Sequence, residues 1–266
     1  MTVRHLLSRS QKFKGDNTMQ SDFSSEEWAV RCDLAAAYRM FAHWDWDDLI
    51  YTHLSARVPG PDHHFLLNPL ELGFDEITAS SLVKVDREGA AVGPTDYSTN
   101  PAGFVIHSAV HHGSEDANCV MHLHTLDGQA MSAQAEGLLP LCQTSMFALG
   151  FGVGYHDYEG PATDLDERER LVRDLGDNGL LMLRNHGTLS VGSSVGEAFT
   201  RMYFLERSCG IQVRAGLGSA KLTEPSLSMV DRTAELSRGL LAEVNVAKAW
   251  PMVVRRATRL FPDLLD

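Results

Sequence analysis

The sequence predicts an α/β sandwich, a fold in which helices cover a central β-sheet. Helical periodicity lies toward both ends of the chain, and short apolar runs broken by Pro, Gly and Asp lie between. Helices that bracket a run of strands bury their apolar faces by packing on a sheet. A chain of 266 residues, 44% of them hydrophobic, is sufficient for one continuous core. We therefore expect one domain over residues 24–266, preceded by a flexible N-terminal tail, residues 1–23.

The first half of the chain begins with a helix and continues with strands. Ser24 and Glu27 have the spacing of a capping box, and apolar residues then recur at helical intervals to about Ala42. The runs that read as strands, apolar and partly β-branched, are residues 49–58, 65–68 and 82–85. The breakers between these runs predict tight turns, and therefore an antiparallel sheet.

The second half of the chain mixes helices and strands. Pro101 opens a predicted helix that continues to His112. The other elements predicted here are strands at 119–124 and 180–184 and helices at 167–173, 195–213 and 231–260. The helix from Val195 carries a largely apolar stripe, so we expect it to pack on the sheet.

Composition excludes several classes of partner. The balance of 35 acidic against 23 basic residues gives a formal charge of -12, which repels the phosphates of nucleic acids and anionic membrane surfaces. No apolar run is long enough for a spanning helix, and the N-terminus lacks the apolar region of a signal peptide. The four cysteines lie far apart without a CxxC pair, which is typical of free thiols. We expect a cytoplasmic protein that binds neither nucleic acid nor membrane.

His122 and His124 form an HxH pair at the end of a predicted strand. Because side chains alternate between the faces of a strand, both imidazoles project to one side and can chelate a cation. The alternative is a hydrogen-bonded pair in the core. His186 offers a third ligand, since it follows another apolar strand and precedes Gly187, whose missing side chain leaves room. Three protein ligands with open positions are the pattern of a catalytic metal site.

The positions of five other histidines suggest no role in chemistry. The chain has 12 histidines, so most of them need no special function. His63-His64 follow Pro-Asp and are expected in a solvated turn. His111-His112 end a helix, where we expect exposure to solvent beside the negative end of the helix dipole. His107 shares a helix face with apolar residues, which predicts packing in the core.

Several motifs together resemble the class II aldolase/adducin family, and its adducin-like branch most closely. The resemblance covers about Trp28 to Ala215. The segments that carry it are THLSAR, FLLNPLELGFDEITASSLVKVD, NPAGFVIHSAVHHGSEDANCVMHLHT, GLLPL, YHDYEGP, LMLRNHGTLSVG and VGEAFTRMYFLERSCGIQVRA.

This resemblance implies an α/β/α sandwich around a mixed, mainly antiparallel sheet. It also implies a homo-oligomer, commonly a tetramer, with active sites near the subunit interfaces. His122 and His124 match the family's HxH ligands, and His186 matches its third histidine. The implied cofactor is a divalent metal, most often Zn²⁺, with Mn²⁺ and others in related decarboxylases; Zn²⁺ suits imidazole ligands in any case.

The implied activity is that of a lyase, either an aldolase or a decarboxylase, on a small hydroxy- or keto-acid. A cation with open positions accepts a carbonyl and a neighbouring oxygen, and stabilises the negative charge left when a C–C bond breaks. Retro-aldol cleavage and decarboxylation share this requirement. The same site could also serve an epimerase.

The sequence departs from the aldolase pattern at two places. The glutamate that transfers protons in these aldolases is Gly103 here, four residues before His107, and the adducin-like branch has the same glycine. Loss of such a group typically costs about 10²–10⁴-fold in rate. The expected phosphate-binding Thr and Gly are Leu70 and Glu71, and a carboxylate repels a phosphate. We therefore expect a substrate without a phosphate.

Four residues of the N-terminal motifs are further candidates for the site. The family's Asn in the strand-turn motif is His53 here, which could act as a proton shuttle or make a structural hydrogen bond. Ser55 and Arg57 match the motif and either line the pocket or brace its turn. With Asn68 they are the candidates for binding substrate.

Residues 155–158, Tyr-His-Asp-Tyr, form a polar and aromatic cluster after a Gly-rich stretch. If this loop reaches the metal, it could supply a substitute acid or base, and Tyr158 is the candidate. The alternative is a turn that Asp157 stabilises.

The alternative to the lyase is a non-catalytic, adducin-like binding or scaffold protein that retains the metal site. Gly103 motivates this alternative, because glycine cannot move a proton. Adducins act at the cytoskeleton through a long tail that ends in a basic segment, and the sequence ends at Asp266 without such a run. We therefore expect the lyase rather than the cytoskeletal role.

Overall fold

The computed structural model describes residues 23–114, 116–160, 167–217 and 221–266, so the predicted N-terminal tail lies outside it except for Phe23. Its α-helices are α1 (Ser25–His43), α2 (Pro101–Gly113), α3 (Leu126–Ser132), α4 (Gln143–Gly150), α5 (Glu167–Leu175), α6 (Val195–Gly216), α7 (Leu227–Leu240) and α8 (Trp250–Leu260). Its strands are β1 (His53–Arg57), β2 (Phe65–Leu67), β3 (Val83–Val85), β4 (Cys119–Leu123), β5 (Val153–His156), β6 (Leu180–Leu183) and β7 (Gly187–Gly192). A 3₁₀ turn spans Phe74–Glu76, and a π-helical segment, Leu241–Ala249, joins α7 to α8.

The seven strands of the described residues form one sheet in the order β3-β2-β1-β4-β7-β6-β5. Every neighbouring pair is antiparallel except β5 and β6, which are parallel. The central pair, β1 and β4, is registered so that His53 lies opposite His122. The prediction of a mixed, mainly antiparallel sheet is confirmed.

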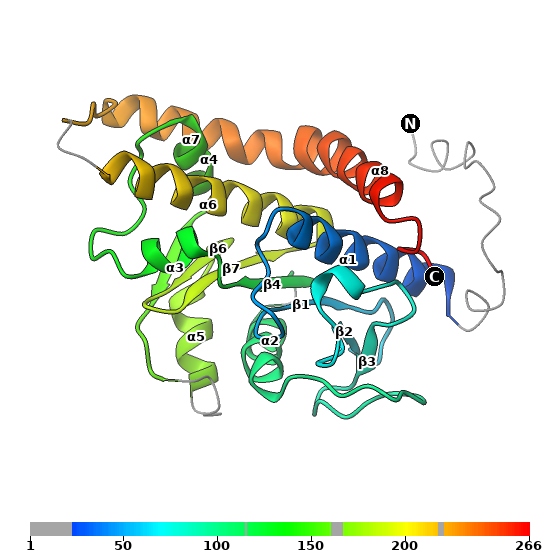
Figure 1. Ribbon diagram of the computed structural model, residues 1–266. Coiled ribbons are helices and arrows are strands. Elements are labelled where there is room, and N and C mark those ends of the chain that lie inside the picture. The colour runs from blue at the N-terminus through cyan, green and yellow to red at the C-terminus, as the bar shows by residue number, and fades with distance from the viewer. Residues whose placement is uncertain (1–22, 115, 161–166, 218–220) are drawn as a thin grey trace.

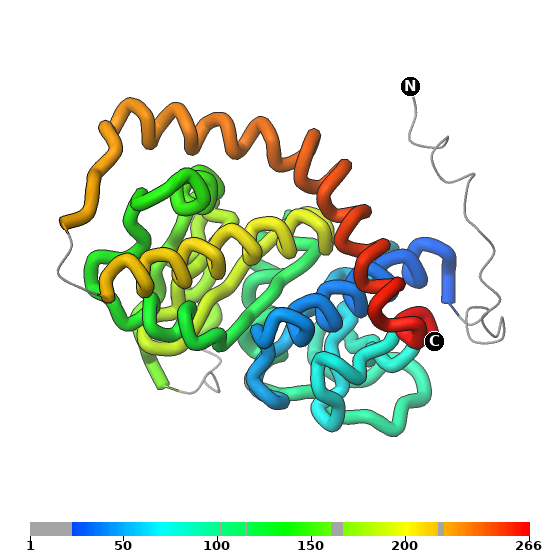
Figure 2. Tube along the Cα trace, turned by 45° about the horizontal axis from the view of Figure 1, so that its top comes forward, coloured from blue at the N-terminus to red at the C-terminus, as the bar shows by residue number. Residues whose placement is uncertain are grey.

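Helices cover both faces of this sheet, as Figure 1 shows. Helices α1 and α6 lie on one face, and α2 and α5 lie on the other. The C-terminal helices then run back along α6 and α1 as one long rod (Figure 2). The predicted α/β/α sandwich is therefore confirmed. Within the described ranges, no helix combines the length and the apolar character needed to cross a membrane.

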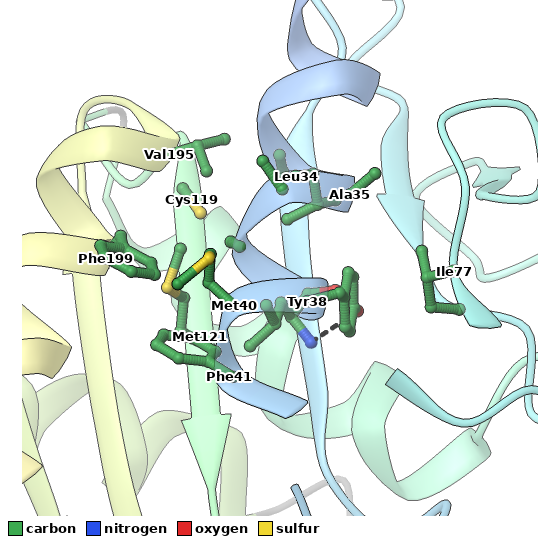
Figure 3. Packing of buried hydrophobic residues seen from close by; sticks show 14 of the residues in the cluster. Leu34, Ala35, Tyr38, Met40, Phe41, Ile77, Cys119, Met121, Val195 and Phe199 are labelled. Atoms are coloured by element: carbon green, nitrogen blue, oxygen red, sulfur yellow. Dashed lines mark hydrogen bonds between the residues drawn. The ribbon is translucent and has the colours of Figure 1, made fainter. Parts of the chain in front are cut away.

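The largest cluster of buried apolar residues lies between α1, α6 and the sheet (Figure 3). Phe41 of α1 stacks on Phe199 of α6 with ring centroids 4.9 Å apart. Leu54 of β1 and Met121 of β4 pack beneath these helices and are fully buried. Because side chains alternate along a strand, the intervening residues of β1 and β4 face α2 instead. The face under α1 and α6 is thus apolar at β1 and β4, whereas the face under α2 carries polar side chains next to a second apolar cluster.

Most predicted elements lie close to their predicted positions. The Ser24 hydroxyl caps α1 by accepting a hydrogen bond from the Glu27 amide at 3.1 Å. The second contact of a capping box would join the Glu27 carboxylate to the backbone amide of Ser24. Here this carboxylate instead forms ion pairs with Arg31 and Lys84, each at 2.9 Å. The run 49–58 is a strand only from His53, and the terminal helix begins at residue 227 rather than 231.

Tyr38 joins α1 to the first part of β1. This part has no partner in β2, because the pairing of β1 with β2 begins at Ser55. The buried Tyr38 hydroxyl accepts a hydrogen bond from the Leu54 amide at 2.7 Å. It lies 2.5 Å from the Leu54 carbonyl oxygen and 2.9 Å from Asn68 Oδ1, and it can donate to either. This hydroxyl therefore takes the place of a strand partner immediately beside His53.

We expect Tyr38→Phe to lower the free energy of unfolding by about 1–3 kcal/mol, because the buried Leu54 amide loses its partner. Denaturant unfolding followed by circular dichroism measures this change. The control is Tyr97→Phe, whose residue is 39% exposed, and it should change stability by less than about 0.5 kcal/mol. Equal effects in the two variants would contradict the bridging role of Tyr38.

Candidate metal centre

His122, His124 and His186 lie together at one edge of the sheet, and their ligand atoms are all within 4.8 Å of one another. His122 is in β4, His124 follows its end, and His186 lies in the turn between β6 and β7. Asn185 in this turn has a φ of 56°, which Asn tolerates better than most residues. A Cβ on Gly187 would come within 2.4 Å of the Leu123 carbonyl oxygen. The missing side chain of Gly187 therefore lets the turn approach β4.

Hydrogen bonds determine which nitrogen of two of these rings carries the proton. His122 Nδ1 donates to the Thr188 carbonyl oxygen at 2.9 Å, and His124 Nδ1 donates to Asp48 Oδ2 at 3.1 Å. This leaves the Nε2 atoms as the ligand atoms of the two rings, and they lie only 2.9 Å apart. Two facing lone pairs repel each other unless a cation lies between them. This donor set therefore fits a divalent metal ion.

The three imidazoles also match the geometry and charge that a metal requires. The ring centroid of His186 lies 4.8 Å from those of both His122 and His124. Ligands at the usual zinc distances are roughly 3.4 Å apart in a tetrahedral site, so small movements bring the three nitrogens into range. Burial, followed by neighbouring imidazoles, holds the pKa of His122 well below its usual value and lowers the pKa of His186 to about 4. Both rings are then neutral ligands at physiological pH.

Glu206 of α6 lies behind the ligands and was not predicted to take part in the site. Its carboxylate is 3% exposed and accepts hydrogen bonds from the Thr125 hydroxyl at 2.5 Å and from the Thr188 hydroxyl. Burial raises the pKa of Glu206 to about 7. These contacts brace the residues that follow His124 and His186. The signal in the sequence was an acidic residue within the apolar stripe of a helix.

A cavity of about 620 Å³ opens onto the three histidines. Apolar and polar side chains share its wall, among them Ile50, Leu70, His53, Asn100 and Tyr158. The Tyr158 ring lies 6.4 Å from the His186 ring and the residue is 55% exposed. Two of the catalytic candidates, His53 and Tyr158, therefore lie at the same cavity as the three histidines.

The His53 ring occupies the space beside Gly103. A Cβ built on Gly103 would come within 2.6 Å of His53 Cδ2 and 2.9 Å of its Nε2. Any larger residue at position 103 would therefore displace this ring. Burial and neighbouring imidazoles hold the pKa of His53 well below its usual value, so the ring is neutral.

The three candidates for substrate binding make other contacts and do not line this cavity. Ser55 is fully buried, with its hydroxyl between His107 and His111. The Arg57 guanidinium donates to the His111 carbonyl oxygen at 2.7 Å and lines a different cavity, of about 930 Å³. Asn68 is buried against the Tyr38 hydroxyl. Ser55, Arg57 and Asn68 thus support the elements around the cavity.

Two sequence interpretations are wrong in part. His111 was expected in solvent, but it is 2% exposed because β1 and α2 pack closely over it, whereas His112 is exposed. Tyr155 and His156 were interpreted as part of a turn, but they belong to β5. The buried His156 ring contacts Asp174 at 2.8 Å and Glu167 at 3.4 Å.

Comparison with known proteins identifies the family of the chain. The sequence profile of the Class II Aldolase and Adducin N-terminal domain matches residues 32–213. A Caulobacter vibrioides protein named "Putative aldolase class 2 protein" is 51% identical over 94% of this chain and 96% of its own. Mouse alpha-adducin is 45% identical over 72% of this chain but only 26% of its own length. The likeness to adducin therefore concerns this domain alone.

Two solved structures superpose on nearly the whole chain. An aldolase II superfamily protein from Pseudomonas syringae has a TM-score of 0.88 at 48% identity, covering 93% of this chain and 99% of that one. An L-fuculose 1-phosphate aldolase from Glaciozyma antarctica PI12 has a TM-score of 0.79 at 25% identity, covering 97% and 98%. The same architecture therefore occurs in proteins described as aldolases.

We expect purified protein to bind about one divalent ion per chain, and His122→Ala to abolish this binding because two nitrogens cannot replace three. Asp48→Asn should weaken the affinity by about 10–100-fold, since the carboxylate orients His124. Mass spectrometry of bound metal and zinc titration measure both effects. His64→Ala, outside the cavity, is the control and should retain the metal. Stoichiometric metal in the His122 variant would show that the ion binds elsewhere.

Proposed function

Because the chain belongs to the class II aldolase and adducin family, we propose that it is a metal-dependent carbon–carbon lyase of the aldolase or decarboxylase type. Its substrate in this proposal is a small hydroxy- or keto-acid without a phosphate. The observation that carries the proposal is the convergence of His122, His124 and His186 at an open cavity beside His53. A cavity of about 620 Å³ suits a small molecule.

Zinc is the proposed cation, with Mn²⁺ or another divalent ion as the alternative. All three ligands are imidazoles, which zinc binds well, and Thr188 and Asp48 orient two of them. When bound, a divalent ion supplies Lewis acidity, which stabilises the negative charge that develops on a carbonyl oxygen. The residues of the chain then have to orient the substrate and move its protons.

The residues beside the cavity disfavour a phosphorylated substrate. Leu70 contributes an apolar side chain to the wall. The Glu71 carboxylate accepts hydrogen bonds from the Ser98 amide at 3.1 Å and from its hydroxyl at 2.5 Å. Donors that a phosphate would need are thus already paired with an anion, which also repels phosphate. A carboxylate or hydroxyl group on the substrate needs no such pocket.

His53 is the proposed proton-transfer residue. The aldolases of this family place a glutamate at the position of Gly103, and the His53 ring fills the space beside that glycine. The ring is neutral and lines the cavity, so it can accept a proton from a substrate held there. Tyr158, whose ring lies near His186 at the opening, is the second candidate, as an acid. The substitution at position 103 is therefore compatible with catalysis.

We expect His53→Asn to lower kcat by about 10²–10⁴-fold while the metal content stays unchanged. Gly103→Glu alone should be unstable, because its Cβ comes within 2.6 Å of the His53 ring. The double variant His53→Asn/Gly103→Glu removes this collision and should recover stability and part of the rate. The assay is release of pyruvate-like, aldehyde or CO₂ product from a panel of hydroxy- and keto-acids by zinc-loaded protein.

The wild-type result on the same panel separates the lyase from its rival. A fully metal-loaded wild-type protein without turnover on any member would refute the lyase and favour the non-catalytic binding or scaffold protein. His64→Ala again serves as the control and should keep the wild-type rate.

A homotetramer with the cavity near a subunit interface is the proposed assembly. Large apolar side chains lie exposed in this region: Tyr51, in the cavity wall, at 58%, Leu49 at 72%, and Leu126, which lines a separate pocket, at 88%. Exposed apolar groups in such number favour contact with another subunit. The cytoplasm is the proposed location, since Cys32, Cys119, Cys142 and Cys209 are all free thiols.

Light scattering after size exclusion should therefore give a mass of about four chains. Leu126→Asp should shift this mass toward smaller species, because burying an unpaired carboxylate in an interface is unfavourable. Leu260→Asp, at an exposed residue of α8, is the control. A monomeric wild-type protein would refute the tetramer.

A further inference from the structure

A layer of polar side chains lies buried between β1 and α2, where a helix packed on a sheet normally buries apolar ones. Its members are His53, Ser55, His107 and His111, and we call them the polar seam. None of the four is more than 3% exposed. Buried polar groups are unfavourable unless they form hydrogen bonds. The seam therefore needs a complete set of partners.

The periodicities of the two elements bring these residues together. Positions 53 and 55 of β1 face α2, and positions 107 and 111 are one helical turn apart on the side of α2 that faces the sheet. His53 Nδ1 lies 2.7 Å from His107 Nε2, and His107 Nδ1 contacts Ser55 Oγ. Ser55 Oγ lies 2.6 Å from His111 Nε2, and His111 Nδ1 lies 2.6 Å from the Ala117 carbonyl oxygen. One unbroken chain of hydrogen bonds results.

The Ala117 carbonyl determines the direction of the first links in this chain. A carbonyl oxygen only accepts, so His111 Nδ1 carries the proton that it donates. Burial lowers the pKa of His111 to about 3, so this ring is neutral and its Nε2 is an acceptor. Ser55 must then donate its single proton to His111.

The remaining links follow from the same reasoning. Because the Ser55 hydroxyl proton is committed to His111, its oxygen accepts from His107 Nδ1. His107 is also neutral, since burial holds its pKa well below the usual value. Its Nε2 therefore accepts from His53 Nδ1. The proton that His111 donates to the Ala117 carbonyl therefore determines the position of every other proton in the seam.

We infer that His107, Ser55 and His111 are positioning residues that hold His53 in the tautomer with a proton on Nδ1 and an unprotonated Nε2. That Nε2 lies on the side of the ring next to Gly103, and His53 lines the cavity of the three histidines. The seam thus presents a lone pair where a substrate proton can be accepted. The tautomer itself is independent of the reaction, while its use as a base rests on the proposed lyase function.

Neutron diffraction from perdeuterated crystals of the purified protein tests each link directly. We expect deuterium on Nδ1 of His53, His107 and His111, on Ser55 Oγ directed at His111, and none on Nε2 of these rings. Deuterium on His53 Nε2 with none on Nδ1 would overturn the inference. Because this result comes from the wild-type protein, it does not depend on whether a variant folds.

Ser55→Ala breaks the chain in its middle and supplies the second test. His111 should stay protonated on Nδ1, whereas His107 and His53 should lose their single tautomer and show deuterium shared between both nitrogens. The matched control is Ser108→Ala, since Ser108 is 1% exposed on α2 and its hydroxyl bonds the Val105 carbonyl outside the seam. Ser55→Thr keeps the hydroxyl and should restore the wild-type pattern. An unchanged His53 in Ser55→Ala would overturn the positioning role.

The two proposals fail separately. If the deuterium pattern is as expected but no acid on the panel is turned over, the lyase is refuted and the seam stands. If turnover is found but His53 carries deuterium on Nε2, the seam is refuted and the lyase stands. Where both hold, Ser55→Ala should lower kcat without lowering the metal content, and Ser55→Thr should restore it.

Discussion

The site depends above all on the antiparallel register of β1 and β4. This register places His53 opposite His122, with both side chains on the face toward α2. A slip of one residue would exchange the two faces of β1, moving Leu54 into the site and His53 into the apolar core. The packing of Leu54 and Met121 under α1 and α6 opposes such a slip. The stability of one face of the sheet therefore maintains the chemistry of the other.

Gly103 and His53 form a matched pair rather than two separate departures from the aldolase pattern. Glycine at 103 leaves room for an imidazole at 53, and a side chain at 103 would collide with that ring. Considered alone, Gly103 suggests a lost proton-transfer group. Considered with its neighbour, it suggests that the group has moved from α2 to β1. The structure joins two positions that lie 50 residues apart in the sequence, which explains why the sequence left their relation open.

Local patterns predicted the longer helices, the central strands and the HxH pair, because each depends on periodicity within a short segment, whereas the short helices α3 and α4 were not predicted. Strands β5 and β7 were not predicted, because their glycines and mixed polarity resemble loops. Pairing makes them strands: β5 pairs with β6, and β7 pairs with β4 and β6. The burial of His111 and the contacts of Asp48 and Glu206 depend on residues distant in sequence. The resemblance to a known family predicted the mixed, mainly antiparallel sheet. Neither the resemblance nor the residue patterns predicted which groups these side chains contact.

One rule relates three imidazoles at the cavity. His122, His124 and His53 each donate from Nδ1 to a group behind them: the Thr188 carbonyl, the Asp48 carboxylate and the His107 ring. The Nε2 atoms are consequently the ones left to bind a metal or a substrate proton. These acceptors belong to three different elements: Thr188 to β7, Asp48 to the segment that follows α1, and His107 to α2. The packing of these elements therefore sets the tautomers, and the ligand that enters does not. Such preorganisation lowers the cost of assembling the site when a cation or a substrate binds. Two of the lone pairs then serve a metal, and the third remains for a proton.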